Sequence, residues 1–380
     1  MDSLTQIVLG AAVAELTIGR KVGNRAILWG AVAGTIPDLD VYTGFIFDDL
    51  TKNEMHRAFS HSLFFCLIAA PVFSWLVMKH EKAFLATFLA AVLGLFVLGG
   101  APLTGWLIVT GIFLFLGFFI WRMKPIAPIS TRTDWTRMMF WTLFTHPLLD
   151  AHTSWGTQLL WPLPWKYSWN NIFVADPLYT VPFLLCMIIV LFLSRKNDLR
   201  RMMTLTGIVI SSTYMLFTLF MKWVTFSRFT ESLEEQGYDL IDISTRPTVL
   251  NCILWTANVD VGDAYLMSYY SVLDKSPIHW VRIPKNEHLL APLAHHEEVE
   301  RLWHLTAGEF AITQKNDTLV YNDLRFGMFG EPVEGGDFVF AYKLIPDGDR
   351  LIVEEIPPPR PEGEEAKQQF AELWERIKGI

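Results

Sequence analysis

Residues 62–78 read SLFFCLIAAPVFSWLVM, an apolar run without a charged side chain. A helix needs about 20 residues of this kind to cross the hydrocarbon core of a bilayer. Runs of similar length and character follow at residues 83–98, 105–121, 178–194 and 204–221. The sequence therefore predicts a mainly α fold, a polytopic helical membrane bundle with five full spans.

Three shorter apolar segments, at residues 4–19, 26–37 and 138–150, contain small residues or end in ionisable ones. We expect them to form shorter helices inserted into the bundle, where protein or water covers their polar groups. The composition agrees, since 18% of the residues are charged and soluble proteins carry about 25%.

The sequence also excludes some classes of protein. It contains no long basic tract, so nucleic-acid binding has no electrostatic support. Cys66, Cys186 and Cys252 lie far apart without a pattern, which argues against a disulfide framework or a thiolate zinc site.

After residue 222 the apolar runs shorten to the length of strands, as at residues 249–255, 337–345 and 350–356. Helical patterns occur around residues 231–236, 295–304 and 364–378. We therefore divide the chain into a helical membrane domain, residues 1–222, and a soluble α+β domain, residues 223–380.

Lysine and arginine gather in alternate joints between the apolar segments, and such joints face the cytoplasm in membrane proteins. The basic residues of these joints are Arg20, Lys21, Arg25, Lys79, Lys82, Arg122, Lys124, Arg132, Arg137, Arg195, Lys196, Arg200 and Arg201. Joints 38–61 and 151–176 and the C-terminal domain then lie on the outer side, away from the cytoplasm. This topology requires that all three shorter segments cross or re-enter the membrane.

Histidine and aspartate concentrate in three short motifs of the apolar part: PDLD at 37–40, HRAFSH at 56–61 and HPLLDAH at 146–152. On a helix, His146 and Asp150 lie one turn apart on the same face. Imidazole and carboxylate ligands without thiolate favour a divalent metal, zinc first, with manganese and iron as alternatives. The predicted ligands are Asp38, His56, His61, His146, Asp150 and His152.

Each of these residues alone also has an ordinary structural explanation. Asp176 before Pro177 makes a good helix start, which favours capping, and Asp2 can cap the first helix in the same way. Their predicted convergence on one membrane face nevertheless favours a functional site. We assign Asp40 and Asp176 as candidate general bases, and Asp2, Gln6 and Arg57 as residues that support the ligands.

The motifs resemble those of inner-membrane metal-dependent hydrolases of the YdjM type. The matching stretches are MDSLTQ at 1–6, GTIPDLD at 34–40, HRAFSHSL at 56–63 and HPLLDAHTSWGTQLLWP at 146–162. The resemblance covers roughly residues 1–200 and continues more loosely into the C-terminal domain. Its ligand pattern is similar to that of zinc-dependent phospholipase C and zinc-dependent nucleases, which implies phosphoester substrates, including lipid or lipid-linked ones.

One position departs from the family pattern, in which many relatives carry histidine where this chain has Gln6. Glutamine is a poor zinc ligand, so the departure puts in doubt a second ion that relies on the N-terminal segment. The core set that remains is Asp38, His61, His146 and Asp150.

Two functions remain open at this stage. The first is a membrane-embedded hydrolase whose partners are membrane lipid and a phosphoester substrate. The second is a non-catalytic membrane anchor or interaction protein with a structural metal site. A transporter ranks third, because the spans are nearly free of charge and no internal repeat occurs. No protein partner is evident from the sequence.

Overall fold

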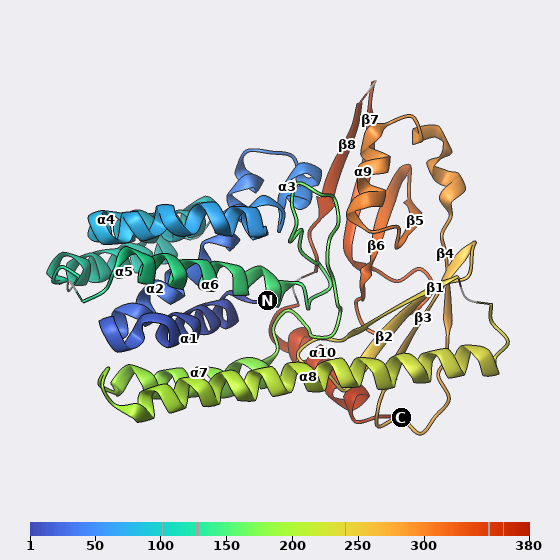
Figure 1. The fold of residues 1–380 in the computed structure, drawn as a ribbon. Coiled ribbons are helices and arrows are strands. Elements are labelled where there is room, and N and C mark those ends of the chain that lie inside the picture. The colour runs from blue at the N-terminus through green and yellow to red at the C-terminus, as the bar shows by residue number, and fades with distance from the viewer. Residues whose placement is uncertain (101, 127–128, 240, 349, 360) are drawn as a thin grey trace.

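The computed structural model describes residues 1–380 except 101, 127–128, 240, 349 and 360. A helical region comes first, as predicted, and a C-terminal domain with two antiparallel sheets follows it (Figure 1). The helices of the first region are α1 (Ser3–Val22), α2 (Asn24–Thr35), η1 (Pro37–Phe45), α3 (Asp49–Met55), η2 (Phe59–His61), α4 (Leu63–Leu98), α5 (Leu103–Arg122), α6 (Arg132–Asp150), α7 (Pro177–Phe192) and α8 (Asp198–Glu235).

Three helices among the described residues are long and apolar enough to cross a membrane: Leu63–Leu98, Thr104–Arg122 and Asp198–Glu235. Two of the predicted spans, 62–78 and 83–98, lie on the single helix α4. The span predicted at 178–194 corresponds to α7, which has only 16 residues. The expectation of five full spans is therefore not confirmed.

Helix α4 bends sharply at His80, whose backbone is non-helical with φ −133° and ψ 35°. The rings of Phe73 and Phe84 are 5.4 Å apart between centroids. Eleven residues of straight helix would separate them by about 16 Å along the axis. The helix therefore folds back at His80, and the two predicted spans are its two arms.

Glycines allow α1 and α2 to pack with their backbones in contact. A Cβ atom on Gly10 would lie 2.3 Å from the carbonyl oxygen of Gly30, and one on Gly34 would lie 2.6 Å from that of Gln6. Larger residues would force the helices apart, because neither carbonyl can rotate out of its helix. This close approach places the start of α1 beside the end of α2.

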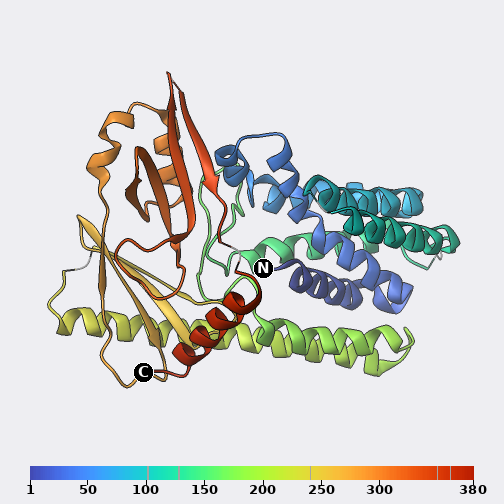
Figure 2. The same cartoon turned by 180° about the vertical axis from the view of Figure 1, so that it is seen from behind.

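The basic joints meet at one end of the bundle. Lys21 in the last turn of α1 pairs with Asp134 of α6 at 2.6 Å, and Arg25 of α2 pairs with Glu81 of α4 at 2.6 Å. Arg195, between α7 and α8, donates to the carbonyl oxygen of Lys21. The chain end at Met1 lies instead at the junction with the sheets (Figures 1 and 2).

The C-terminal part contains two four-stranded antiparallel sheets, each with its strands in chain order. The predicted strand at 249–255 is misplaced, because a turn with Leu250 at φ 62° precedes the strand. The elements are β1 (Asp242–Pro247), β2 (Leu254–Asp260), β3 (Ala264–Ser271), β4 (Val281–Pro284), η3 (Glu287–Leu293), α9 (Glu297–Leu305), β5 (Phe310–Lys315), β6 (Thr318–Met328), β7 (Phe338–Asp347), β8 (Arg350–Ile356) and α10 (Gly363–Ile377).

Two helices of the first region hold the sheets. Helix α8 continues through the predicted domain boundary at residue 222 and packs Phe229 against Trp255 and Tyr270 of the first sheet. Helix α3 lies beside β8 (Figure 1), where Leu50 enters the core of the second sheet and Lys52 pairs with Glu355 at 2.9 Å. The segment between α2 and α4 is therefore held between the helices and the second sheet.

Candidate metal centre

Four of the predicted ligands converge at the junction between the helices and the sheets. Ligand atoms of Asp38, His61, His146 and Asp150 all lie within 4.8 Å of one another. Asp38 comes from the start of η1, His61 from the end of η2, and the other two from the last turns of α6. Nε2 of His61 lies 3.2 Å from Nε2 of His146 and 3.2 Å from Oδ2 of Asp150.

The predicted one-turn spacing in α6 holds, since Nε2 of His146 lies 3.3 Å from Oδ2 of Asp150. The same nitrogen lies 3.3 Å from Oδ1 of Asp38. His61, His146 and Asp150 are buried, whereas the Asp38 side chain is 22% exposed. Of the four residues, Asp38 is therefore the one that faces solvent.

Backbone and side-chain acceptors orient both imidazole rings. Nδ1 of His146 lies 2.6 Å from the carbonyl oxygen of Gly34, which can only accept, so Nδ1 carries the proton. Nδ1 of His61 lies 3.0 Å from Oγ of Ser60 and 3.4 Å from Oδ2 of Asp40. A carboxylate or carbonyl behind a histidine fixes its tautomer and raises the basicity of the other nitrogen. Both Nε2 atoms consequently face the cluster, where each could bind an ion in place of a proton.

Asp40, a candidate general base in the sequence, lies behind His61 and outside the four-residue cluster. Its Oδ2 accepts the backbone N–H of Arg57 at 2.9 Å, and its Oδ1 lies 3.1 Å from Nδ1 of His56. Burial alone would raise the pKa of Asp40, but the hydrogen bond and charge of His56 lower it. Asp40 is therefore a charged group that orients His61.

Asp38 is held as a carboxylate in the same way. Burial would raise its pKa, but His146 and then His61 keep the pKa well below its usual range. An ionised carboxylate is the form that binds a metal.

Asp150 carries the clearest indication of a cation. Its Oδ1 accepts from Nε2 of Gln6 at 3.0 Å and pairs with the N-terminal ammonium of Met1. Its Oδ2 is buried and accepts no hydrogen bond, although Nε of Arg57 lies 3.4 Å away. Ligand atoms of two imidazoles and two carboxylates thus face one another, an arrangement that a divalent cation would stabilise. The donor set of two nitrogens and two oxygens fits zinc, manganese or iron.

Two predicted ligands lie outside the cluster. His56 follows the end of α3, binds Asp40 and packs against Trp155 with ring centroids 5.3 Å apart. His152 follows the end of α6, and its Nδ1 lies 2.8 Å from Oδ1 of Asn171. Burial lowers the pKa of both imidazoles. Neither residue joins the set that could hold an ion.

The remaining predicted residues have structural or supporting contacts. Asp176 caps α7 and accepts from the hydroxyl of Tyr214 at 2.8 Å, and Asp2 caps α1. Gln6 lies beside Asp150, as expected of a supporting residue, but its Oε1 is buried without a hydrogen-bond partner.

Arg57 contacts both Asp40, which lies behind His61, and Asp150 of the four-residue cluster. Its φ of 59° lies in the left-handed region, which a side chain with a Cβ rarely adopts. This conformation lets its backbone N–H reach Asp40 while its guanidinium reaches Asp150 and, at 2.7 Å, Oγ1 of Thr153. Strain of this kind is typical of functional sites.

Sequence reasoning missed the contributions of Met1, Gly34 and Thr153. A terminal ammonium and a glycine carbonyl leave no side-chain pattern, so no signal in the sequence could have found the first two. Thr153 directly follows the HPLLDAH motif, but only the fold shows that it binds Arg57.

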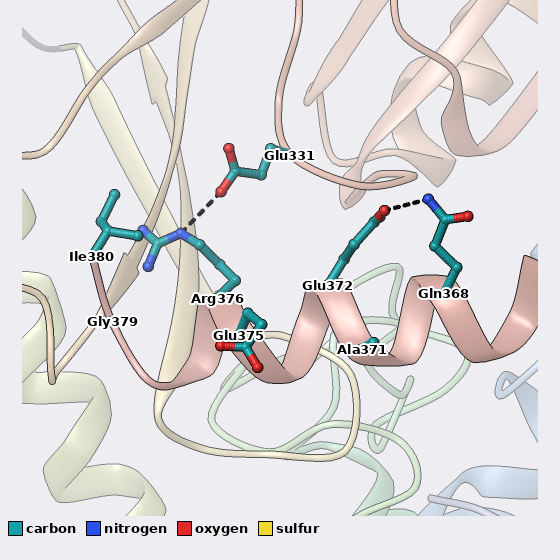
Figure 3. A pocket seen from close by; sticks show the side chains of 8 residues that line it. All are labelled: Glu331, Gln368, Ala371, Glu372, Glu375, Arg376, Gly379 and Ile380. Carbon is teal, nitrogen blue, oxygen red and sulfur yellow. Dashed lines mark hydrogen bonds and ion pairs between the residues drawn. The ribbon is translucent and has the colours of Figure 1, made fainter.

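A separate pocket lies on the C-terminal domain, between α10 and Glu331 (Figure 3). Arg376 pairs with Glu331 at 3.0 Å, and Gln368 donates to Glu372 at 2.8 Å. Its polar groups bind one another, so this pocket is a weaker candidate site than the His/Asp cluster.

The fold and the cluster define a polytopic helical protein with a buried His/Asp centre, joined to a domain of two sheets. The profile of the YdjM inner membrane protein family matches residues 1–225 of the chain. The protein belongs to this family. No curated protein and no solved structure showed a significant match.

Proposed function

We propose that the protein is a membrane-embedded, metal-dependent hydrolase of phosphoesters. The observation that supports this most is the set of four facing ligand atoms, with the buried Oδ2 of Asp150 left without a hydrogen bond. Such groups are costly at a membrane face unless they are paired or coordinated.

In this proposal Asp38, His61, His146 and Asp150 hold one divalent ion, for which we favour zinc. The ion would supply Lewis acidity, which polarises a phosphoryl oxygen and acidifies water. The carbonyl of Gly34 holds the ring of His146, and Gln6 holds Oδ1 of Asp150. These contacts fix the ligands before substrate binds, which reduces reorganisation during the reaction.

In this proposal neither Asp40 nor Asp176, the two predicted general bases, acts on substrate. Asp40 is buried behind His61, and Asp176 is occupied by the first turn of α7 and by Tyr214. We assign Asp40 as a positioning residue. Asp38 is the exposed ligand, so substrate approaches the cluster from its side.

For the location, we propose a bacterial inner membrane with the His/Asp cluster and the C-terminal domain on the periplasmic side. The basic joints lie at the bundle end away from Met1, and basic joints face the cytoplasm. The substrate would then be a phosphoester at the periplasmic face of the inner membrane, including a lipid or lipid-linked one.

Metal analysis and hydrolysis together test this function. Detergent-purified protein should contain about one equivalent of a divalent metal and should hydrolyse bis(p-nitrophenyl) phosphate or p-nitrophenyl phosphate. His61→Ala should lose both the metal and the activity, whereas His152→Asn should keep both, because His152 lies outside the cluster.

Two outcomes would contradict the proposal. Wild-type protein without stoichiometric metal would refute the centre itself. Metal retained without turnover of either ester, combined with a loss of thermal stability in His61→Ala, would instead favour the structural site of an anchor protein.

A further inference from the structure

Buried hydrogen-bond donors without partners gather beside the His/Asp cluster. They are Nε of Arg57, Nε1 of Trp155, Oγ1 of Thr157 and Nζ of Lys166. A buried donor without a partner costs about 1–3 kcal/mol, and more when it is charged. Four such donors in one region indicate a place where a ligand supplies the acceptors.

The backbone brings these four residues together. Thr157 exchanges backbone hydrogen bonds with Tyr167, the neighbour of Lys166, at 3.0 and 2.9 Å. The N–H of Gln158 donates to the carbonyl of Arg57 at 3.0 Å. The donors therefore come from three adjoining stretches of backbone, one of which carries Arg57 to within 3.4 Å of Asp150.

Trp155 connects this group to the second sheet. Nζ of Lys166 lies 5.6 Å from the ring centroid of Trp155, and Cζ of Arg325 from β6 lies 5.8 Å from it. Phe326 and Phe340 of the same sheet pack against the indole, at 5.5 and 5.7 Å between centroids. Cations from the loop and from the C-terminal domain thus meet over one aromatic ring.

The three cations Arg57, Lys166 and Arg325 differ in whether a carboxylate neutralises their charge. Arg325 pairs with Asp323 at 2.7 Å, and Arg57 lies against Asp150. Among the described residues Lys166 has no such partner, although Glu54 and Asp323 attract it from further away. Burial, with Arg325 and Arg57 nearby, lowers the pKa of Lys166 to about 7. Lys166 as a whole residue is partly exposed while its Nζ is buried, so the ammonium group points inward.

We propose that Arg57, Trp155, Thr157 and Lys166 form a binding subsite for the phosphoryl group of the substrate, adjoining the His/Asp cluster. A phosphate monoester offers several acceptor oxygens and about two negative charges, which match four donors that include two cations. Its role as a substrate subsite rests on the proposed hydrolase function. Its binding chemistry can be tested separately.

Inorganic phosphate is the first probe, titrated calorimetrically into the full-length protein in detergent, with and without a metal chelator. Lys166→Met keeps the length of the side chain and removes its charge. We expect phosphate affinity to fall by about 10- to 100-fold in Lys166→Met, in chelated protein as well as metal-loaded protein. Lys343→Met, at an exposed position of β7, is the matched control and should bind like wild type.

Thermal unfolding distinguishes this role from a structural one. Removing an unpaired buried cation should raise the thermal midpoint of Lys166→Met without phosphate, while phosphate should stabilise only the wild type and the control. A lower midpoint in Lys166→Met without phosphate would show that the lysine supports the fold, and would overturn the subsite.

Competition identifies the source of the phosphoryl group. Glycerol 3-phosphate and short-chain phosphatidic acid carry the same phosphate monoester on a soluble and on a lipid molecule. Displacement of phosphate by either one supports the subsite and identifies the kind of substrate. Displacement by neither, or equal phosphate affinity in wild type and Lys166→Met, would overturn it. Metal content and hydrolysis are measured on the same samples, so the proposed hydrolase function is tested separately from the phosphate subsite.

Discussion

Replacing Asp40 by asparagine separates an orienting role from a catalytic one. Asparagine keeps the shape of the side chain and one acceptor oxygen but removes the charge behind His61. Oδ2 of Asp40 lies 3.4 Å from Nδ1 of His61, and that nitrogen also contacts Ser60 at 3.0 Å. The imidazole would therefore keep one partner but lose the carboxylate that raises its basicity.

The geometry sets the expected magnitude. Loss of a group that orients a metal ligand typically weakens metal affinity by about 10- to 100-fold. The contact of Asp40 with His61 is longer than an ordinary hydrogen bond and is shared with Ser60, so we expect the lower end, about tenfold or ~1.4 kcal/mol. Competition with a fluorescent zinc chelator, in detergent and at fixed pH, measures this affinity.

Two further variants serve as controls for the zinc affinity of Asp40→Asn. Asp38→Asn removes a proposed ligand and should weaken zinc binding by more than about 100-fold, beyond the range for an orienting group. Asp48→Ala removes the cap of α3, where Asp48 accepts the N–H of Thr51 at 2.9 Å. It should cost about 1 kcal/mol of stability and leave zinc affinity unchanged. An Asp40→Asn variant with wild-type zinc affinity and a kcat reduced by more than about 100-fold would refute the orienting role and restore the general base.

Three further outcomes follow from the structure. Glu15→Gln leaves the guanidinium of Arg200 buried without its carboxylate, and this should cost about 3 kcal/mol of stability, the low end for a buried pair, because Asn24 still binds Arg200. Asp198→Asn, in the exposed pair with Arg20, should cost under about 1 kcal/mol. Thermal unfolding in detergent compares the two variants. Removal of metal by a chelator should lower the thermal midpoint of wild type, and added zinc should restore it. Sulfate keeps its charge near neutral pH, whereas Lys166, with a pKa of about 7, loses its proton. The affinity of wild type for sulfate should therefore fall as pH rises through about 7, and the affinity of Lys166→Met should fall less. An affinity of wild type that does not change with pH would contradict this.

The four-residue cluster can be predicted from the sequence because local spacing determines much of it. The i, i+4 spacing puts His146 and Asp150 on one face of α6, and the alternation of basic joints puts Asp38 and His61 at the same end of the bundle. His152 belongs to the same motif but lies beyond the last turn of α6, where helical periodicity no longer sets the direction of a side chain. Local spacing therefore cannot separate it from the ligands.

Other features depend on contacts that no local pattern encodes. Hydropathy predicts apolar segments but not whether two of them form separate helices or the two arms of one bent helix. The bend of α4 depends on the backbone conformation of His80. The donors beside the cluster come from residues 57, 155–157 and 166, and Arg325 joins them from β6. The four donors meet through backbone contacts between distant stretches of chain, and Arg325 reaches them only because the sheet domain docks there; sequence periodicity describes neither.

The docking of that domain gives the sheets a role in the chemistry of the bundle. Helix α3 lies in the chain between Asp38 and His61, and it contacts both a strand and a helix of the C-terminal domain. The N–H of Glu355 in β8 donates to Asp49 at 3.0 Å, and Arg301 of α9 pairs with Glu54 at 2.7 Å. Half of the proposed ligand set is thus carried by a segment that the C-terminal domain holds in place. The same domain supplies Arg325 and the aromatic residues around Trp155. The sheets therefore form one wall of the site, and their removal would release both the ligands of the 38–61 segment and the cations beside them.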